Sequence, residues 1–181
     1  MKKLLLIVDP QIDFISGSLP VEGADEAMQK LGEYIKAHNG EYLFKVVTTD
    51  WHPYHHCSFK AQGGPWPMHC VQNTVGAAIT PHLIDPLNQT DGELCVLRKG
   101  DNAESEEYSI FKNAYSKILL TQLIKEMDQV DVCGIAGDIC VLNTLKDGIA
   151  QFGKEKFNVL TDFCPSLDKG EALSKFIKEN L

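Results

Sequence analysis

The sequence lacks the features that mark membrane-spanning and nucleic-acid-binding proteins. No stretch approaches the roughly 20 consecutive apolar residues that a membrane-spanning helix needs. Seventeen Lys and Arg residues against twenty-five Asp and Glu give a net charge of −8, and no basic stripe is present, which argues against binding to nucleic acid. No internal repeat, low-complexity segment or linker divides the 181 residues. We therefore expect one domain, residues 1–181, that binds neither membrane nor nucleic acid.

The sequence also lacks any CxxC pair, although it has six cysteines. This absence disfavours a thiol oxidoreductase, which needs a resolving partner. The apolar run near the amino terminus stops at Asp9 and Pro10 with no small-residue cleavage site, so it predicts a buried strand rather than a secretion signal. Cys95 and Cys133 lie inside apolar, strand-like runs, where a reduced thiol behaves as a small hydrophobic group. We expect free thiols and a cytoplasmic protein.

Apolar runs alternate with amphipathic patterns along most of the chain. The runs are mostly continuous, which is typical of parallel strands covered on both faces. The intervening patterns repeat at helical spacing. Together they predict a three-layer α/β/α fold with an open, mainly parallel, Rossmann-like sheet. The predicted strands are Leu4–Asp9, Leu43–Thr49, Leu94–Arg98, Val130–Ala136 and Phe157–Asp162.

One segment, from Trp51 to Gly92, breaks this alternation. Its many prolines and glycines leave little room for regular structure, so we predict a long irregular loop. Loops of this length in compact domains are usually functional or disordered. This one holds five of the six histidines, which favours a function.

Reactive side chains follow the predicted strands at their carboxyl ends, where open α/β sheets bind ligands. Asp9, Asp50 and Lys99 come after the first three strands, and Cys140 lies where the fourth gives way to a helix. A helix amino terminus and a nearby lysine favour a thiolate, and a carboxylate can accept the thiol proton. We therefore predict an activated nucleophile formed by Asp9, Lys99 and Cys140. Taken singly, each would more often be a turn residue, a solvated lysine or an inert cysteine.

The histidine-rich loop suggests a metal site. Asp50 and His52 are two residues apart, so on an extended segment they point the same way, and His69 can return from the loop as a third ligand. This set suits Zn, Mn or Fe(II) and leaves open positions for water or substrate. The alternatives are a chance histidine-rich surface and a structural zinc site that uses Cys57 or Cys70. The remaining isolated histidines, His38 and His82, are assigned structural roles.

Three aromatic residues fall near the same predicted rim and would suit a flat ring. They are Phe14, Trp66 and Tyr108. Aromatic side chains are core residues more often than binding walls.

At this point the residues resemble a known family. Asp9–Phe14 is similar to the D-x-Q-x-D-F opening of the isochorismatase-like cysteine hydrolases, Lys99-Gly100 to their catalytic lysine, and Gly134–Val141 to their nucleophile turn. Asp50–Phe59 and Trp66–Val71 resemble the D-W-H-P-x-N-H-x-S-F and W-P-x-H-C-V signatures of the nicotinamidase/pyrazinamidase branch, which carries a metal. Tyr108–Phe111 is similar to its Y-S-x-F segment, so the resemblance spans roughly residues 4 to 165.

The resemblance implies an activity and a role for each site residue. Cys140 would attack the carboxamide carbon of nicotinamide or pyrazinamide, with Asp9 as base and Lys99 orienting the pair. A thioester would form, ammonia would leave, and water would release nicotinate for NAD salvage. The backbone N–H groups of Ala136 and Cys140 would form the oxyanion hole, next to a cis peptide bond between Ile135 and Ala136.

The resemblance also implies ligands and partners. Asp50, His52 and His69 would hold one divalent ion, zinc first, with manganese or iron as alternatives. Phe14, Trp66 and Tyr108 would wall the ring of this small-molecule substrate. Homo-oligomers are common in the family. The rivals are an amidohydrolase acting on another small amide, and a non-catalytic metal-binding protein that kept the fold.

Two features depart from the family pattern. His55 replaces the usual Asn before His56, so whether His55, His56 or Ser58 approaches the metal stays open. The loop between Phe59 and Trp66 is short, which would open the pocket and alter the range of substrates.

Overall fold

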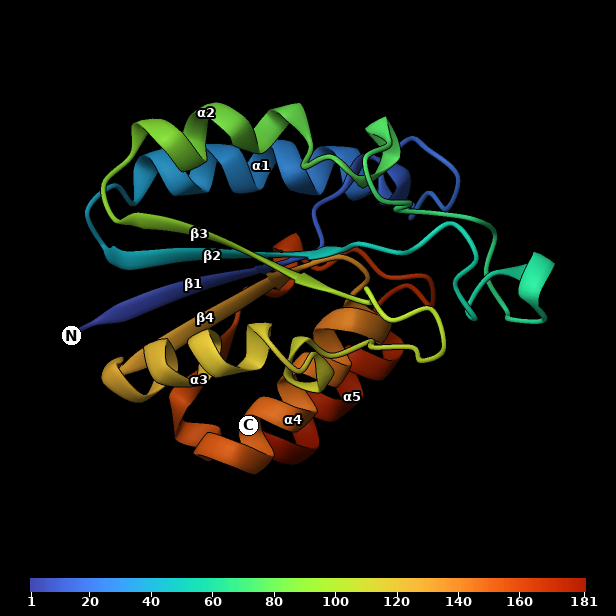
Figure 1. The fold of residues 1–181 in the computed structure, drawn as a ribbon. Coiled ribbons are helices and arrows are strands. Elements are labelled where there is room, and N and C mark those ends of the chain that lie inside the picture. Colours follow the sequence, from blue (N-terminus) through green and yellow to red (C-terminus); the bar gives the residue numbers. More distant parts are fainter.

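The computed structural model describes residues 1–181 and contains one five-stranded, fully parallel sheet with the strand order β3-β2-β1-β4-β5 (Figure 1). The predicted strands are all present, with small shifts at their ends. Their bounds are β1 (Lys3–Val8), β2 (Tyr42–Asp50), β3 (Glu93–Lys99), β4 (Gln129–Gly134) and β5 (Phe157–Val159).

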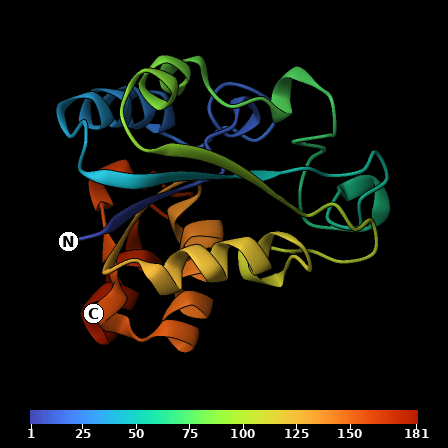
Figure 2. The same ribbon diagram turned by 60° about the vertical axis from the view of Figure 1, so that its left-hand side comes forward.

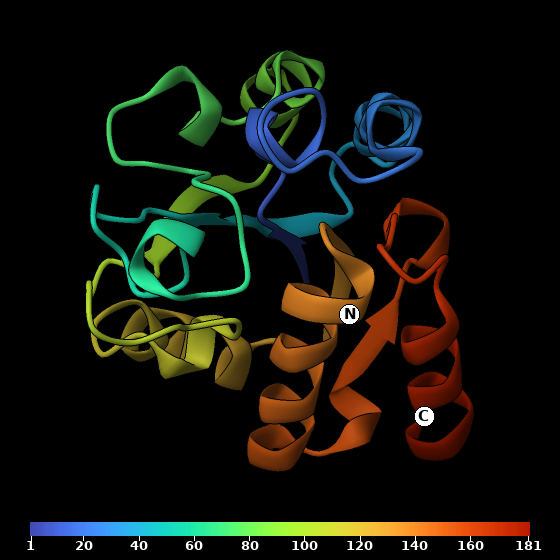
Figure 3. The same cartoon turned by 90° about the vertical axis from the view of Figure 1, so that its right-hand side faces the viewer.

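Helices cover both faces of this sheet. One face carries α1 (Ala24–Ala37) and α2 (Pro81–Gln89), which lie above the strands in Figures 1 and 3. The other face carries α3 (Ser116–Glu126), α4 (Leu142–Phe152) and α5 (Glu171–Asn180). The three-layer α/β/α architecture with a parallel sheet is therefore confirmed. No helix combines the length and the apolar character that a membrane crossing requires.

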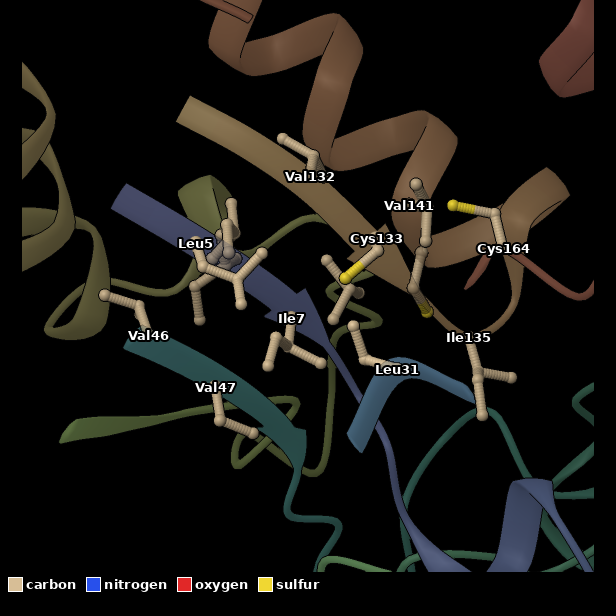
Figure 4. Close-up of a cluster of buried hydrophobic side chains, with 14 of the residues drawn as sticks. Leu5, Ile7, Leu31, Val46, Val47, Val132, Cys133, Ile135, Val141 and Cys164 are labelled. Carbon is tan, nitrogen blue, oxygen red and sulfur yellow. The ribbon is translucent and has the colours of Figure 1, made fainter. Parts of the chain in front are cut away.

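The core is centred on β1, which has a strand on each side and helices on both faces. Its residues from Leu4 to Val8 are completely buried. Figure 4 shows Leu5 and Ile7 surrounded by apolar side chains from the neighbouring strands. Because a strand in this position meets no water on either face, its sequence is a continuous apolar run. The rigid centre fixes where the strands end, and so where the residues that follow them lie.

Helix α2 corrects one prediction, because it lies within the segment expected to be irregular. Pro81 occupies the first turn, where a missing N–H is tolerated, and the Thr80 hydroxyl accepts a hydrogen bond from the His82 N–H. At the other end the Lys45 ammonium donates to the carbonyl oxygen of Leu87 at 2.8 Å. These caps satisfy groups that a short helix leaves unpaired, and the count of prolines alone does not reveal them.

The rest of the segment, residues 51–80, is irregular as predicted. It holds two short 3₁₀ turns, Lys60–Gln62 and Val75–Ala77. Figures 1 and 2 show it, in cyan to green, extending past the carboxyl ends of the strands. The loop therefore covers the edge of the sheet where the reactive side chains were predicted to meet.

Candidate active site

Four strands deliver polar side chains to one buried cluster at the carboxyl edge of the sheet. Asp9 follows β1, Asp50 ends β2, Lys99 ends β3, and Cys140 lies in the turn after β4. The Lys99 Nζ atom is 2.8 Å from Asp9 Oδ2, 2.5 Å from Asp50 Oδ1 and 3.5 Å from Cys140 Sγ. The sulfur also lies within 4.8 Å of a carboxylate oxygen of Asp9. The structure thus brings together the residues that the sequence predicted to converge.

Burial and the lysine charge set the protonation states in this cluster. Burial lowers the pKa of Lys99, but the Asp50 and Asp9 carboxylates raise it more, so the pKa ends well above its usual value. Burial raises the pKa of Asp9 against the opposing effect of Lys99, which makes this carboxylate more basic than an exposed one. Lys99 therefore remains an ammonium ion between two acidic side chains.

The thiol of Cys140 differs from the thiolate that the sequence suggested. Burial raises its pKa well above the ordinary value, and this outweighs the lowering effect of Lys99. The residue also lies inside a π-helical turn, Gly137–Val141, that precedes α4. The high pKa favours a neutral Cys140 thiol beside the basic Asp9 carboxylate. The thiol proton would then be removed while the sulfur attacks, not before.

The turn that carries Cys140 has an unusual backbone. The peptide bond between Ile135 and Ala136 is cis, as the family resemblance predicted. Gly134 has φ 121°, and a Cβ there would lie 2.1 Å from the Val8 carbonyl oxygen, so only glycine fits. The N–H of Ala136 donates to no group of the protein. This free donor beside the sulfur is available to a developing oxyanion.

A mainly apolar pocket opens onto Cys140. The predicted aromatic residues Phe14, Trp66 and Tyr108 all line it, and the Trp66 indole N–H donates to the Tyr108 hydroxyl at 3.0 Å. Sequence reasoning missed other lining residues, which come from apolar or acidic stretches without a distinguishing pattern. They are Leu19, Val21, Glu106, Ile139 and Leu167.

Beside this pocket, Asp50, His52 and His69 form a compact group with one potential ligand atom each, all within 4.8 Å of one another. The Nδ1 atoms of His52 and His69 lie 2.9 Å and 2.8 Å from the carbonyl oxygens of Gly100 and Pro67. A carbonyl oxygen can only accept a hydrogen bond, so each Nδ1 carries the hydrogen and donates it. Each Nε2 therefore keeps a free lone pair.

The unsatisfied atoms of this group fit a divalent cation. His52 Nε2 is buried without any hydrogen-bond partner and lies 3.6 Å from Asp50 Oδ2. Burial raises the pKa of Asp50, but the Lys99 ammonium beside it has the largest opposing effect, so the side chain is a carboxylate. One carboxylate and two imidazoles match the donor set of zinc and related metals.

The neighbouring histidines are arranged differently. His55 is exposed. His56 is buried, its Nδ1 accepts from the Ser58 backbone N–H at 3.3 Å, and its Nε2 lies 3.1 Å from the Ser105 carbonyl oxygen. Because a backbone N–H can only donate, His56 carries its proton on Nε2 and uses both nitrogens within the protein. His56 also forms a group with His52 and Glu106 whose potential ligand atoms lie within 4.8 Å of one another, so it stands next to the three predicted ligands.

The alternatives for the metal site gain no support. Neither Cys57 nor Cys70 belongs to a group of side chains spaced to hold an ion, and all six cysteines are free. His38 and His82 belong to no group that could hold an ion, and each contacts another part of the protein. His38 Nδ1 is 2.8 Å from the Tyr34 carbonyl oxygen, and His82 Nε2 is 2.9 Å from Asp25 Oδ1.

Comparisons with known proteins show which family this chain belongs to and what it is similar to. The sequence profile of the isochorismatase domain matches residues 3–169. The nicotinamidase of Escherichia coli is 32% identical over 182 residues, covering 90% of this chain and 82% of its own length. The pyrazinamidase of Pyrococcus horikoshii, solved in complex with zinc, is 33% identical with a TM-score of 0.79, covering 99% and 97% of the two chains. PnC1 of L. infantum, in complex with nicotinate, is 31% identical with a TM-score of 0.81, covering 98% and 87%.

Proposed function

The chain belongs to the isochorismatase domain family, and from this premise we propose that it is a nicotinamidase that hydrolyses nicotinamide to nicotinate and ammonia in NAD salvage. One observation carries the proposal: Cys140 lines the same pocket as Asp50 and His69, and the buried side chains of Lys99 and Asp9 lie directly behind its sulfur. The similarity to nicotinamidases and to a protein bound to nicotinate supports this choice of substrate.

The proposed reaction begins with attack by the Cys140 sulfur on the carboxamide carbon. Asp9 accepts the thiol proton as the carbon–sulfur bond forms, and it then delivers that proton to the departing nitrogen. The carbon–nitrogen bond breaks, ammonia leaves, and a thioester remains on Cys140. Water then attacks the thioester carbon, Asp9 accepts a water proton, and the sulfur leaves as the thiol when nicotinate is released.

The surrounding groups stabilise the charges that develop. The backbone N–H groups of Ala136 and Cys140 would hold the negative oxygen in both steps, and the free N–H of Ala136 supports this role. Lys99, held between Asp9 and Asp50, orients the base and offsets negative charge beside the sulfur. A pyridine ring would lie among Phe14, Trp66 and Tyr108, which line the pocket.

Asp50, His52 and His69 would hold one divalent ion. Zinc is the first choice, because the similar pyrazinamidase of P. horikoshii is in complex with zinc and the donor set suits it. When bound, the ion supplies Lewis-acid coordination for a ring nitrogen and for water. The three side chains are already oriented toward one another, so little rearrangement is needed to bind it.

An assay of ammonia and nicotinate production tests the proposal. The purified protein is given nicotinamide, pyrazinamide, benzamide and a carbamoyl amide, before and after chelation and again after addition of zinc. We expect turnover of nicotinamide and pyrazinamide, loss of turnover on chelation and recovery with zinc. Preferential turnover of the carbamoyl amide, or full activity in the chelated protein, would contradict it.

A further inference from the structure

Two residues of the opening segment Asp9–Phe14 have no part in the proposed chemistry. Gln11 and Asp13 do not line the pocket, and Gln11 is completely buried. The Gln11 side chain forms hydrogen bonds with the backbone of Asp50. The Asp13 side chain accepts one from the backbone next to His69.

Asp50 lies where β2 loses its neighbour on one side. Strand β1 pairs with β2 as far as Ile7 and Val47, and the Asp9 N–H still donates to the Thr48 carbonyl oxygen at 3.0 Å. Asp9 then adopts φ 47°, which turns the chain away from the sheet. Along a strand, successive residues direct their backbone groups to opposite sides, so the N–H and C=O of Asp50 face the side that β1 has left.

Gln11 fills the place of the missing strand. The Asp50 N–H donates to Gln11 Oε1 at 2.7 Å, and Gln11 Nε2 donates to the Asp50 carbonyl oxygen at 2.8 Å. The same Nε2 atom donates to the Ala77 carbonyl oxygen at 2.9 Å. The side-chain amide thus continues the ladder for one more residue and fixes the backbone from which the Asp50 carboxylate projects.

Asp13 holds the other metal-binding segment in a similar way. Its Oδ2 accepts the N–H of Cys70 at 2.7 Å, and Cys70 directly follows His69 with φ 45°, a conformation that non-glycine residues seldom adopt. Gly76 packs against the carboxylate so closely that a Cβ there would lie 2.1 Å from Oδ2. Asp13 therefore stabilises the turn that aims His69 at the site.

We propose that Gln11 and Asp13 are positioning residues for the divalent ion, acting through the backbones of Asp50 and Cys70. This inference rests on the proposed function, because it concerns the ion that Asp50, His52 and His69 would hold. The short segment Asp9–Phe14 thereby carries the base, Asp9, and also holds two of the proposed metal ligands in position. Outer-shell substitutions at metal sites typically reduce metal affinity by about 10- to 100-fold, and a comparable loss is expected here.

Zinc affinity, measured by competition with a chromophoric chelator, tests this proposal independently of turnover. Gln11→Met removes all three hydrogen bonds with little change in size, and we expect zinc to bind about 10- to 100-fold more weakly. Asp13→Asn leaves one carbonyl oxygen for the N–H groups of Cys70 and Ser18, which bond to separate carboxylate oxygens in the wild type, so a smaller loss is expected. Nicotinamide turnover should recover toward the wild-type kcat as zinc is raised, measured at a temperature at which the zinc-free variant is fully folded, because zinc would also restore a partly unfolded protein.

Tyr42→Phe is the matched control. It removes a buried hydrogen bond at the opposite end of the sheet, from Tyr42 to Asp131, and should lower the melting temperature without changing zinc affinity. Wild-type zinc affinity in folded Gln11→Met protein would overturn the proposal. If that variant does not fold, wild-type affinity in Asp13→Asn protein overturns it instead. Failure of the wild-type protein to bind zinc or hydrolyse nicotinamide would refute the proposed function itself.

Discussion

Two buried polar clusters lie at opposite ends of the sheet and differ in how their hydrogen bonds are satisfied. At the amino end, Asp131 on β4 is 2% exposed. Its oxygens accept from the Tyr42 hydroxyl at 2.7 Å, the Gln129 amide at 2.5 Å and the Asn158 amide at 2.8 Å. Burial raises the pKa of Tyr42, so this hydroxyl remains a donor. Three neutral donors thus satisfy this carboxylate, and the Lys3 ammonium lies 3.9 Å from its Oδ2.

The cluster at the carboxyl end is equally buried but is not satisfied by the protein. Two carboxylates, Asp9 and Asp50, share the single ammonium of Lys99, and His52 Nε2 has no partner. The N–H of Ala136 is also free. A buried polar group without a partner is destabilising. Together with the neighbouring pocket and thiol, these unpaired groups support the proposal that the carboxyl-end cluster performs chemistry, whereas the amino-end cluster stabilises the fold.

The largest expected effect comes from removing the nucleophile. Cys140→Ala should reduce kcat for nicotinamide by at least about a thousandfold, because no other group can form the thioester. The measurement is nicotinate production by the zinc-loaded variant. The control is Cys133→Ala, which removes another buried thiol, on β4, and should lower the melting temperature while retaining turnover. Retained activity in Cys140→Ala would show that the carboxyl-end cluster does not supply the nucleophile, and the proposed difference between the two clusters would be wrong.

The second-largest effect is expected from a comparison of the two buried aspartates, Asp9 and Asp131. Asp9→Asn should lower kcat by about 10²- to 10⁴-fold, since the amide cannot accept the thiol proton. Asp131→Asn should leave turnover near the wild-type level but reduce the free energy of unfolding by about 1–3 kcal/mol, because one donor loses its acceptor. Turnover and urea unfolding of both variants check the pair. If the two aspartates gave the same pattern, the contrast would be wrong.

The smallest effect is expected from Tyr42→Phe. Asp131 keeps its two amide donors in this variant, so the free energy of unfolding should fall by only about 1 kcal/mol. Turnover should be unchanged, since the hydroxyl is far from the pocket. Urea unfolding and the nicotinamide assay measure both quantities. A large loss of turnover would show that the amino-end cluster also acts on the site.

Much of the candidate site could be predicted because its residues follow strands. Once the apolar runs were taken as parallel strands, Asp9, Asp50, Lys99 and Cys140 had to meet at one edge, and the structure places them there. The family resemblance added Ala136 and strengthened the assignment of the three aromatic residues to the substrate ring. Their catalytic, metal-binding and substrate-binding roles stay predictions until the variants are measured.

What the sequence did not reveal depends on contacts between distant segments. Helix α2 forms in a proline-rich stretch. Thr80 and Pro81 give its start a local signature, whereas the cap that Lys45 gives its end comes from a distant strand. The neutral state of the Cys140 thiol follows from complete burial, which no motif states. Gln11 belongs to a visible motif, yet its role depends on β1 leaving the sheet two residues earlier, at Asp9.

The central claim is that the Cys140 sulfur becomes covalently bonded to the substrate. Mass spectrometry of the zinc-loaded protein, quenched in acid during turnover of nicotinamide and followed by peptide mapping, tests it most directly. The account predicts the added mass of one nicotinoyl group on the peptide that contains Cys140. Nicotinate production with that group on another residue, or on none, would contradict it.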